Sequence, residues 1–516
     1  MPVADLILKN ANVVTVDQNH PNARLVAVKR DTIVLVTDNS DGLQSISGAK
    51  TKIIDCQGKT VVPGFNDAHC HIFSYIRKLL SIDLSPSSVS SISNIKATIR
   101  QKVQNTPFGQ GFIGTDYNDF YLSERRHPNR WDIDKVAPHH PVILSHRSLH
   151  ACVLNSLALS LANITKETPA PPGGFIDRDP NSGEPTGLLF EMLGHIREKV
   201  MPPISEEELT NGITSANRHY LSQGITSLQD ATAVNDSKRW QYFNQFKDAD
   251  RLKSRVCMMT GIKGLIQFRE AGLTSGYGNS HLRLGALKLL PSESTGHLYP
   301  PQSELNQQVF DAHRAGFQLA IHAIQQSTVE AAIIALEYAC RLLPKSDHRH
   351  RIEHCSECPP HLLNRLKKLQ ALVVTQPPFL YHSGKRYLVT VPTEQLRWLY
   401  RIKSFLNSGL IVAGSSDSPI VPNNPLDGIF AAVTRQAKSG QQLLPQECIS
   451  ASQALAMYTI NAAYATFEEG IKGSITQGKL ADIVLLSDDP TTTPPENIKD
   501  IKVEMTIIGG DVVWEA

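Results

Sequence analysis

The segment that decides the fold is Pro63–His71, which reads PGFNDAHCH and continues an apolar, strand-like run that begins at Val61. Residues two apart on extended backbone face the same side of a strand, so His69 and His71 can both point into one site. Cys70 would then point the other way and pack against the core. A single His-x-His is more often structural than functional, so its meaning depends on what stands at the ends of other strands.

The middle of the chain reads as repeated β-α units. From the second candidate onward, the strands begin roughly 22 to 40 residues apart, with helix-like segments between them, as a strand, a helix and two loops require. Eight such units predict an α/β fold of the (β/α)8 TIM-barrel type. The candidate strands are Val61–Phe65, Ile225–Gln229, Arg255–Thr260, Gly285–Leu290, Gln318–Ile321, Arg349–Glu353, Ala371–Thr375 and Leu410–Ala413, and the helix-like segments include Gln302–His313, Thr328–Leu343 and Pro360–Lys368.

Both ends of the chain are rich in short β-like runs separated by turn residues. We expect residues 1–62 and 471–516 to build one small β-sandwich domain, with the barrel at 63–470 between them. The first interval between barrel strands, from Phe65 to Ile225, spans about 160 residues, far more than one β-α unit needs. An inserted subdomain at about 80–215 is therefore predicted.

Composition and charge narrow the class of protein. The chain has 516 residues, of which 41% are hydrophobic and 19% charged, as in ordinary globular proteins. A net charge of +2 gives no electrostatic footprint for nucleic acid or an anionic membrane. There is no apolar run of about 18 residues, no signal-peptide pattern, and the eight cysteines are too sparse for a disulfide framework. We expect a soluble cytoplasmic protein that acts on a small molecule.

Polar residues with metal-binding or catalytic side chains stand at the ends of several candidate strands. Barrel active sites lie at the C-terminal ends of the strands, so these side chains should converge on one mouth. They are His69 and His71 after the first strand, Lys288 in the fourth, His322 and His354 at the ends of the fifth and sixth, and Asp417 after the eighth.

This set of side chains suits metal-assisted hydrolysis. Neutral imidazoles and a carboxylate bind Zn²⁺ and similar ions, and an open coordination position admits water. A bound metal lowers the pKa of that water towards 7 and polarises a carbonyl group, as hydrolysis of an amide or ester requires. Asp417 could accept the proton of the water and pass it to the leaving nitrogen.

The chain also resembles a known family over nearly its whole length. It is similar to the amidohydrolase superfamily and, within it, to the family 3 branch of metal-dependent hydrolases that includes N-substituted formamide deformylase. The segments that carry this resemblance are Val62–Phe65 with His69-x-His71, Asn155–Leu159, Pro185–Leu188 with Glu191, Gly224–Ser227 with Asp230, Ala320–Ala323, Arg351–His354, Gln376-Pro377, Ser416–Pro419 and Gly478–Leu485.

The resemblance implies a role for each residue of the cluster. Lys288 stands where the family has a carbamylated lysine that bridges two metal ions, since a free ammonium would repel a cation. Zinc is the expected metal, with one or two ions per chain, although Mn, Fe, Co or Ni would also suit the ligands. By resemblance, the metal ligands are His69, His71, Lys288, His322, His354 and Asp417.

The predicted insertion supplies candidates for contact with the substrate. By resemblance, His150 faces the active site, where it could bind the substrate carbonyl or the developing oxyanion. A histidine that only holds the insertion together is the alternative. Tyr117 and Glu191 are weaker candidates for substrate binding.

The cluster predicts metal-dependent hydrolysis, and the resemblance implies an amidohydrolase that cleaves the C–N bond of a non-peptide amide, of the N-acyl or N-formyl type, through a metal-bound hydroxide. A cyclic-amide or ester hydrolase uses the same chemistry and stays open. A deaminase is less favoured, because Ala-Ile-Gln-Gln follows His322 where deaminases commonly have a glutamate. A non-catalytic scaffold is less favoured still, because all six positions are present. A homodimer is implied by the resemblance alone.

Two further expectations concern residues close to His354 in the sequence. Strand alternation should aim Arg351 and Glu353 away from the site, where they would pair with each other or support the ligands. Cys355 and Cys358 form a C-x-x-C motif. No second pair at zinc-finger spacing accompanies it, so two reduced thiols in a loop are favoured over a redox or zinc pair.

Overall fold

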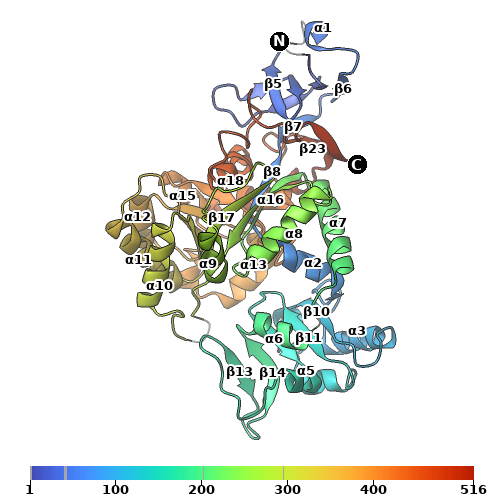
Figure 1. Cartoon of the computed structure of the whole chain (residues 1–516), viewed down its shortest axis with the longest axis vertical. Coiled ribbons are helices and arrows are strands. Elements are labelled where there is room, and N and C mark those ends of the chain that lie inside the picture. The colour runs from blue at the N-terminus through green and yellow to red at the C-terminus, as the bar shows by residue number, and fades with distance from the viewer. Residues whose placement is uncertain (1–2, 40–42, 202, 294–295) are drawn as a thin grey trace. The chain divides into compact units, whose positions relative to one another are not determined.

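The central feature of the computed structural model is a sheet of eight parallel strands in the order β21-β20-β19-β18-β17-β16-β15-β8 (Figure 1). Strands that follow one another along the chain lie side by side, as the predicted α/β barrel requires, and the barrel is nearly closed. The strands are β8 (Phe65–Cys70), β15 (Ile225–Asp230), β16 (Arg255–Thr260), β17 (Leu282–Leu289), β18 (Leu319–Ala323), β19 (Arg351–His354), β20 (Leu372–Thr375) and β21 (Val412–Gly414).

The structure describes residues 3–39, 43–201, 203–293 and 296–516. The chain divides into two compact units, of which the first comprises Met1–Ile72, Ile213–Pro291 and Gln302–Ala516. The second comprises Phe73–Gly212 and Ser292–Pro301.

Backbone hydrogen bonds close the barrel between β8 and the segment that follows β21. The Asp417 N–H donates to the His69 carbonyl at 2.8 Å, and the His71 N–H donates to the Ser418 carbonyl at 2.8 Å. Closure therefore sets a residue from late in the chain directly beside the two histidines of the first barrel strand.

The helices alternate with the barrel strands, and those predicted from the sequence are present within two residues at each end. They are α10 (Gln302–Arg314), α11 (Gln326–Leu342) and α12 (Pro360–Leu369). The other helices are α1 (Leu43–Ile46), α2 (Ile72–Leu80), α3 (Ile92–Gln104), α4 (Arg130–Asp134), α5 (Ser156–Leu161), α6 (Leu193–Val200), α7 (Glu206–Ser222), α8 (Ser237–Asp248), α9 (Ile262–Glu270), α13 (Pro378–Thr390), α14 (Thr393–Leu396), α15 (Ile402–Asn407), α16 (Pro425–Thr434), α17 (Ala451–Met457) and α18 (Ile460–Tyr464).

Gly64 marks the point where the chain leaves one sheet for another. The strand β7 (Thr60–Pro63) pairs with β22 (Ile483–Leu486), and β8 begins only at Phe65. The prediction of one barrel strand at Val61–Phe65 is therefore wrong in its bounds, because two sheets share the apolar run. A Cβ on Gly64 would lie 2.2 Å from the Thr226 hydroxyl, so only glycine allows this close approach.

Both termini contribute strands to two further sheets of the first unit. A six-stranded sheet in the order β24-β23-β22-β7-β2-β3 combines both ends of the chain, and a four-stranded sheet in the order β5-β4-β1-β6 is N-terminal. Leu6 and Val61 share one buried cluster with Ile483 and Met505. The strands are β1 (Leu6–Lys9), β2 (Asn12–Val14), β3 (Asn22–Ala23), β4 (Leu25–Lys29), β5 (Thr32–Thr37), β6 (Lys52–Asp55), β22 (Ile483–Leu486), β23 (Val503–Ile508) and β24 (Asp511–Glu515).

The second unit is built on a mixed sheet in the order β13-β14-β12-β11-β10-β9. Ile143 and Leu144 are neighbours on β11 but belong to different buried clusters, because successive residues of a strand face opposite sides of the sheet. Its strands are β9 (Ile82–Asp83), β10 (Phe112–Tyr117), β11 (Val142–His146), β12 (Ala151–Leu154), β13 (Phe175–Arg178) and β14 (Pro185–Phe190).

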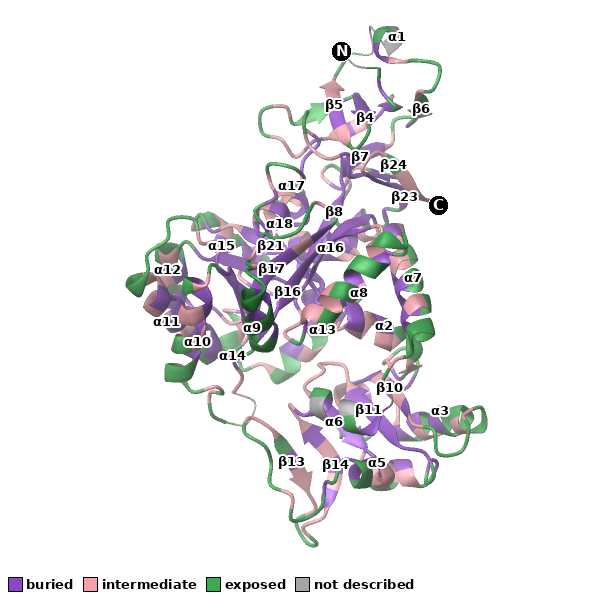
Figure 2. Cartoon of the chain, viewed as in Figure 1, coloured by how far each residue is buried: buried purple, intermediate pink, exposed green. Residues whose placement is uncertain are grey.

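Burial is greatest in the barrel strands (Figure 2). Every residue of β8, β15 and β16 is buried, including polar side chains, so each of these needs a partner inside the protein. Among the described residues, no helix combines the length and the apolar character that crossing a membrane would take.

A buried ion pair joins the barrel to the six-stranded sheet. Arg255 on β16 donates from Nε and Nη2 to the two carboxylate oxygens of Asp482, at 2.6 and 2.9 Å. Asp482 directly precedes β22 and also accepts the Gly509 N–H at 3.0 Å. The side chains of the pair are only 2% and 4% exposed. Such a bidentate contact fixes the orientation of both partners.

Replacing Asp482 by alanine should lower the free energy of unfolding by about 3–5 kcal/mol, because the Arg255 guanidinium is left buried without its counter-charge. Urea unfolding followed by circular dichroism measures the change. Arg314→Gln, which breaks an exposed pair with Asp311, is the matched control and should cost less than about 1 kcal/mol. An equally small loss for Asp482→Ala would show that the pair is dispensable.

Candidate metal centre

Three ligand groups meet at the C-terminal end of the barrel strands. Nitrogen atoms of His69 and His71 and a carboxylate oxygen of Asp417 all lie within 4.8 Å of one another. Asp417 Oδ1 is 3.0 Å from His71 Nε2 and 3.5 Å from His69 Nε2. The two imidazoles therefore do face one site, as the His-x-His spacing predicts.

The other three residues predicted for the cluster lie beside this group. Lys288 Nζ is 3.1 Å from His69 Nε2. The ring of His354 is 5.0 Å from that of His69 and 4.5 Å from that of His322, measured between centroids. Strands β8, β17, β18 and β19 and the segment after β21 thus bring all six side chains together. Their role as metal ligands stays a prediction.

Three of the histidines are oriented by a hydrogen bond at Nδ1. This leaves Nε2 directed at the cluster, which is the arrangement that metal-binding histidines usually have. Gln376 also donates its side-chain N–H to the Ser415 hydroxyl at 2.9 Å, so its carbonyl oxygen faces the imidazole. The partners are Glu353 for His69, Thr232 for His71 at 2.9 Å, and Gln376 for His354 at 2.7 Å.

Glu353 points into the barrel, which corrects the expectation from strand alternation. Its carboxylate accepts hydrogen bonds from Arg351 Nε and Nη2 at 2.7 and 3.1 Å as well as contacting His69. The alternation ends at His354, whose backbone has a φ of 70°. This left-handed turn lets two successive side chains, Glu353 and His354, face the interior. The expected pairing of Arg351 with Glu353 is present.

Electrostatics favour a cation in this cluster. Burial keeps the pKa of His69 well below its usual value, so the ring is neutral at neutral pH. Burial also lowers the pKa of Lys288 to about 8. For Asp417, burial raises the pKa, but the hydrogen bond from His71 and the surrounding imidazoles outweigh this and hold it below its ordinary range. Neutral imidazoles beside an ionised carboxylate are the ligand form that Zn²⁺ binds.

A second group of possible ligands, His313, Cys340 and His350, lies elsewhere in the first unit. Hydrogen bonds already occupy its ring nitrogens. The Leu319 N–H donates to His350 Nδ1 at 3.1 Å, His350 Nε2 is 2.8 Å from His313 Nδ1, and His313 Nε2 is 2.7 Å from the Leu343 carbonyl. The proton on His350 Nε2 blocks the atom that would bind a metal, so this group serves as a neutral structural pair.

The candidates for substrate contact lie in the second unit. Glu191 accepts a hydrogen bond from Nδ1 of His150 at 3.0 Å, and the side chain of His150 is 45% exposed. Tyr117 is fully buried and its hydroxyl pairs with His127 Nδ1 at 2.9 Å, a placement that does not favour contact with a substrate. The substrate-binding roles of all three stay predictions.

Sequence reasoning missed Thr232 as a partner of the site. It follows β15 by two residues, so the same inspection of strand ends, applied to the second strand, could have found it. The two cysteines after His354 are free thiols, as expected, and both are buried. A hydrogen bond to Cys358 and burial raise the pKa of Cys355, which keeps this thiol protonated and unreactive.

Asp417→Asn and His71→Ala should each reduce the metal content of the purified protein to less than half, because each removes a ligand atom from the cluster. Elemental analysis of protein prepared without chelators measures the content. Cys340→Ser, in the second group, is the matched control and should leave it unchanged. Loss of metal in Cys340→Ser and not in the other two variants would show that the metal binds to the second group instead.

Glu353→Gln should weaken binding of Zn²⁺ by about 10- to 100-fold, because the carboxylate that orients His69 and strengthens its basicity is lost. Competition with a chromophoric chelator measures the affinity. Gln376→Glu adds a carboxylate at the equivalent position behind His354 and should not weaken binding. Unchanged affinity in Glu353→Gln would mean that Glu353 only neutralises Arg351.

Comparison with known proteins agrees with this geometry. N-substituted formamide deformylase from Arthrobacter pascens is 28% identical over 99% of this chain and 98% of its own length. The putative amidohydrolase YtcJ of Bacillus subtilis is 26% identical, over 94% of this chain and 95% of its own. The crystal structure of an uncharacterized metal-dependent hydrolase from Pyrococcus furiosus has 26% identity and a TM-score of 0.73, and the match covers 94% of this chain and 100% of that one.

The family model described as Amidohydrolase family matches residues 52–514, which include the barrel strands and every residue of the cluster. This match covers most of the chain. The description of the family names hydrolases, the same class of enzyme that the names of the relatives indicate. The chain therefore belongs to the amidohydrolase family.

Proposed function

We propose that this protein is a metal-dependent hydrolase that cleaves the C–N bond of a non-peptide amide, of the N-acyl or N-formyl type. The observation that carries the proposal is the group formed by His69, His71 and Asp417 at the mouth of the barrel. Family membership supports hydrolysis as the reaction class. The formamide deformylase relative, similar over its whole length, supports an amide of this type.

The ligand set fits one or two divalent ions, and zinc is the proposed metal. When bound, the ion would lower the pKa of a water molecule and polarise the carbonyl of the substrate. Lys288 would take part as a carbamate, since its side chain lies among the ligands and its pKa is lowered to about 8 by burial. The neutral amine that reacts with carbon dioxide therefore makes up about a tenth of the side chain at pH 7, far more than for a lysine with the ordinary pKa of about 10.4.

The chain's own residues would move the proton. Asp417 is held ionised and its Oδ1 lies within 3.5 Å of two imidazoles, so it is ready to accept a proton at the start of the reaction. The same carboxyl group could then deliver that proton to the departing amine nitrogen. His150, oriented by Glu191, would hydrogen-bond the substrate carbonyl oxygen.

Cyclic amides and esters remain the second class of substrate, because the proton transfers would be the same. A deaminase is disfavoured by the sequence after His322, where Gln326 begins α11 and no acidic residue stands nearby in the chain. A non-catalytic scaffold is disfavoured because the six side chains of the cluster are retained and gathered.

We also propose the domain organisation, the cellular location and the oligomeric state of this enzyme. Residues 1–62 and 471–516 would form a small β-sandwich domain, which is supported by the pairing of β22 with β7. Residues 63–470 would carry the catalytic barrel, with an inserted subdomain at about 80–215 that shapes the substrate pocket. We place the protein in the cytoplasm, as a homodimer that binds neither nucleic acid nor membrane.

The substrate class can be tested with matched compounds. The zinc-loaded protein should release amine from N-substituted formamides, and Asp417→Asn should lower kcat by about 10²- to 10⁴-fold. Released amine is measured by derivatisation, and the corresponding acetamide, lactam and ester are assayed in parallel. Turnover of the lactam or ester alone would replace the proposed substrate class, and no turnover with any zinc-loaded sample would favour the scaffold.

The state of Lys288 predicts a pH dependence for metal loading. With a pKa of about 8, the amine is mostly ammonium at pH 6.5 and mostly neutral at pH 8.5. Bicarbonate, adjusted to give the same dissolved carbon dioxide at both pH values, should therefore speed zinc loading roughly twentyfold more at the higher pH. Stopped-flow reconstitution of metal-free protein measures the rate. Lys288→Glu, which carries a permanent carboxylate, should load independently of bicarbonate. The same bicarbonate effect in that variant would exclude a carbamate on Lys288.

A further inference from the structure

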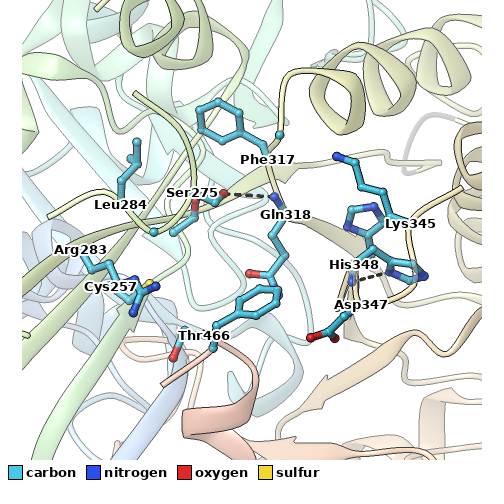
Figure 3. A pocket seen from close by; sticks show the side chains of 15 residues that line it. Cys257, Ser275, Arg283, Leu284, Phe317, Gln318, Lys345, Asp347, His348 and Thr466 are labelled. Atoms are coloured by element: carbon cyan, nitrogen blue, oxygen red, sulfur yellow. Dashed lines mark hydrogen bonds between the residues drawn. The ribbon is translucent and has the colours of Figure 1, made fainter. Parts of the chain in front are cut away.

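A cavity lies at the opposite end of the barrel from the metal cluster. Its volume is about 330 Å³. Phe317 and Gln318 line it just before β18, and His348 and His350 line it just before β19, whereas the ligand histidines lie at the far ends of these same strands. All the residues that line the cavity belong to the first unit (Figure 3).

Arg283 presents a guanidinium group to this cavity. Its side chain makes no hydrogen bond with the residues that the structure describes, and the nearest described carboxylate is Glu468, at 4.0 Å. The Oε2 atom of that carboxylate lies 2.9 Å from Lys472 Nζ and accepts a hydrogen bond from the Thr466 hydroxyl at 2.8 Å, whereas Arg283 faces Oε1 in a long ion pair without a hydrogen bond. The hydrogen-bonding capacity of Arg283 is thus available to a ligand.

Lys345 adds a second positive charge at the cavity. Its ammonium donates to the His313 carbonyl at 2.6 Å, and no described carboxylate lies within ion-pair distance. Asp347, which also lines the cavity, is paired with Arg349 at 2.9 Å. Figure 3 shows Arg283 and Lys345 on opposite sides of the cavity. Together they give it a surplus of positive charge.

Gln318 supplies a fixed hydrogen-bond acceptor. Its side-chain N–H groups donate to the carbonyls of Arg349 and Ala465 at 2.5 and 2.9 Å, which sets the orientation of the amide. The amide oxygen accepts no hydrogen bond from the residues that the structure describes, although the residue is only 6% exposed. With no donor among the described residues, this oxygen can accept an N–H or O–H group of a ligand in the cavity.

The rest of the cavity wall combines the hydroxyl residues Ser275 and Thr466 with apolar and aromatic side chains. Leu284 and Phe317 are buried, and Phe467 stands 39% exposed beside them. Small-molecule sites usually combine walls of this kind with a few fixed polar groups, in volumes from about 300 Å³ upward. The cavity has this composition.

We propose that this cavity binds a small aromatic carboxylate that also carries a hydrogen-bond donor. The planar guanidinium of Arg283 receives the carboxylate in a two-point contact, the oxygen of Gln318 receives the donor, and Phe467 covers the ring. A polyanion without an O–H donor, such as sulfate, fits less well, because the lone pairs of Gln318 repel a second charged oxygen. The site is separate from the metal cluster and does not depend on the proposed reaction.

Three related compounds test the proposal on the unaltered protein by isothermal titration calorimetry. They are 3-hydroxybenzoate, benzoate, which lacks the donor, and 3-hydroxybenzyl alcohol, which lacks the carboxylate. We expect saturable binding of 3-hydroxybenzoate with a Kd below about 1 mM. Benzoate should bind several-fold more weakly, and the alcohol should not bind measurably. Equal binding of all three, or no saturation by about 10 mM, would overturn the proposal.

Variants then locate the site. Arg283→Gln should weaken binding of 3-hydroxybenzoate at least tenfold. Arg283→Lys keeps the charge but not the two-point contact, so its affinity should lie between those of the unaltered protein and Arg283→Gln. Arg314→Gln removes an exposed arginine of α10 outside the cavity and should bind like the unaltered protein. Binding should also survive removal of metal by a chelator. Binding that is unchanged in Arg283→Gln, or that disappears with the metal, would overturn the assignment.

Discussion

The structure depends on the closure of the barrel between its first and last strands. The two backbone hydrogen bonds that join Asp417 to His69 and His71 to Ser418 bring together residues nearly 350 positions apart. Asp67 strengthens this seam by accepting the Ser416 N–H at 3.0 Å. Closure and site formation are therefore one event, because the hydrogen bonds that complete the barrel also place the carboxylate against the imidazoles.

Burial inside the closed barrel then sets the chemistry. A buried imidazole or amine resists protonation, so His69 stays neutral and the pKa of Lys288 falls to about 8. Asp417 keeps its negative charge because His71 donates a hydrogen bond to it and other imidazoles surround it. The interior also holds Glu353 and Arg351, whose charges cancel while the carboxylate orients a ligand ring. The result is a concentrated set of cation ligands.

The sequence was sufficient to predict the barrel and the gathering of the six side chains, because the rhythm of strands and helices and the residues at strand ends are local patterns. It was not sufficient for Gly64, where one apolar run serves two sheets, since pairing between distant strands decides that boundary. Nor could alternation reveal Glu353, because the left-handed backbone of His354 interrupts it. Nor could the sequence show that Arg283 faces Glu468 without a hydrogen bond to it, because that depends on how the distant β17 and the segment after α18 pack.

The central claim is that the cluster at the barrel mouth binds a metal ion. X-ray diffraction from crystals of zinc-supplemented protein, collected on both sides of the zinc absorption edge, tests this most directly. The account predicts an anomalous peak within bonding distance of His69, His71 and Asp417, with continuous density from Lys288. A peak at His313 and His350, or no peak at all, would contradict it.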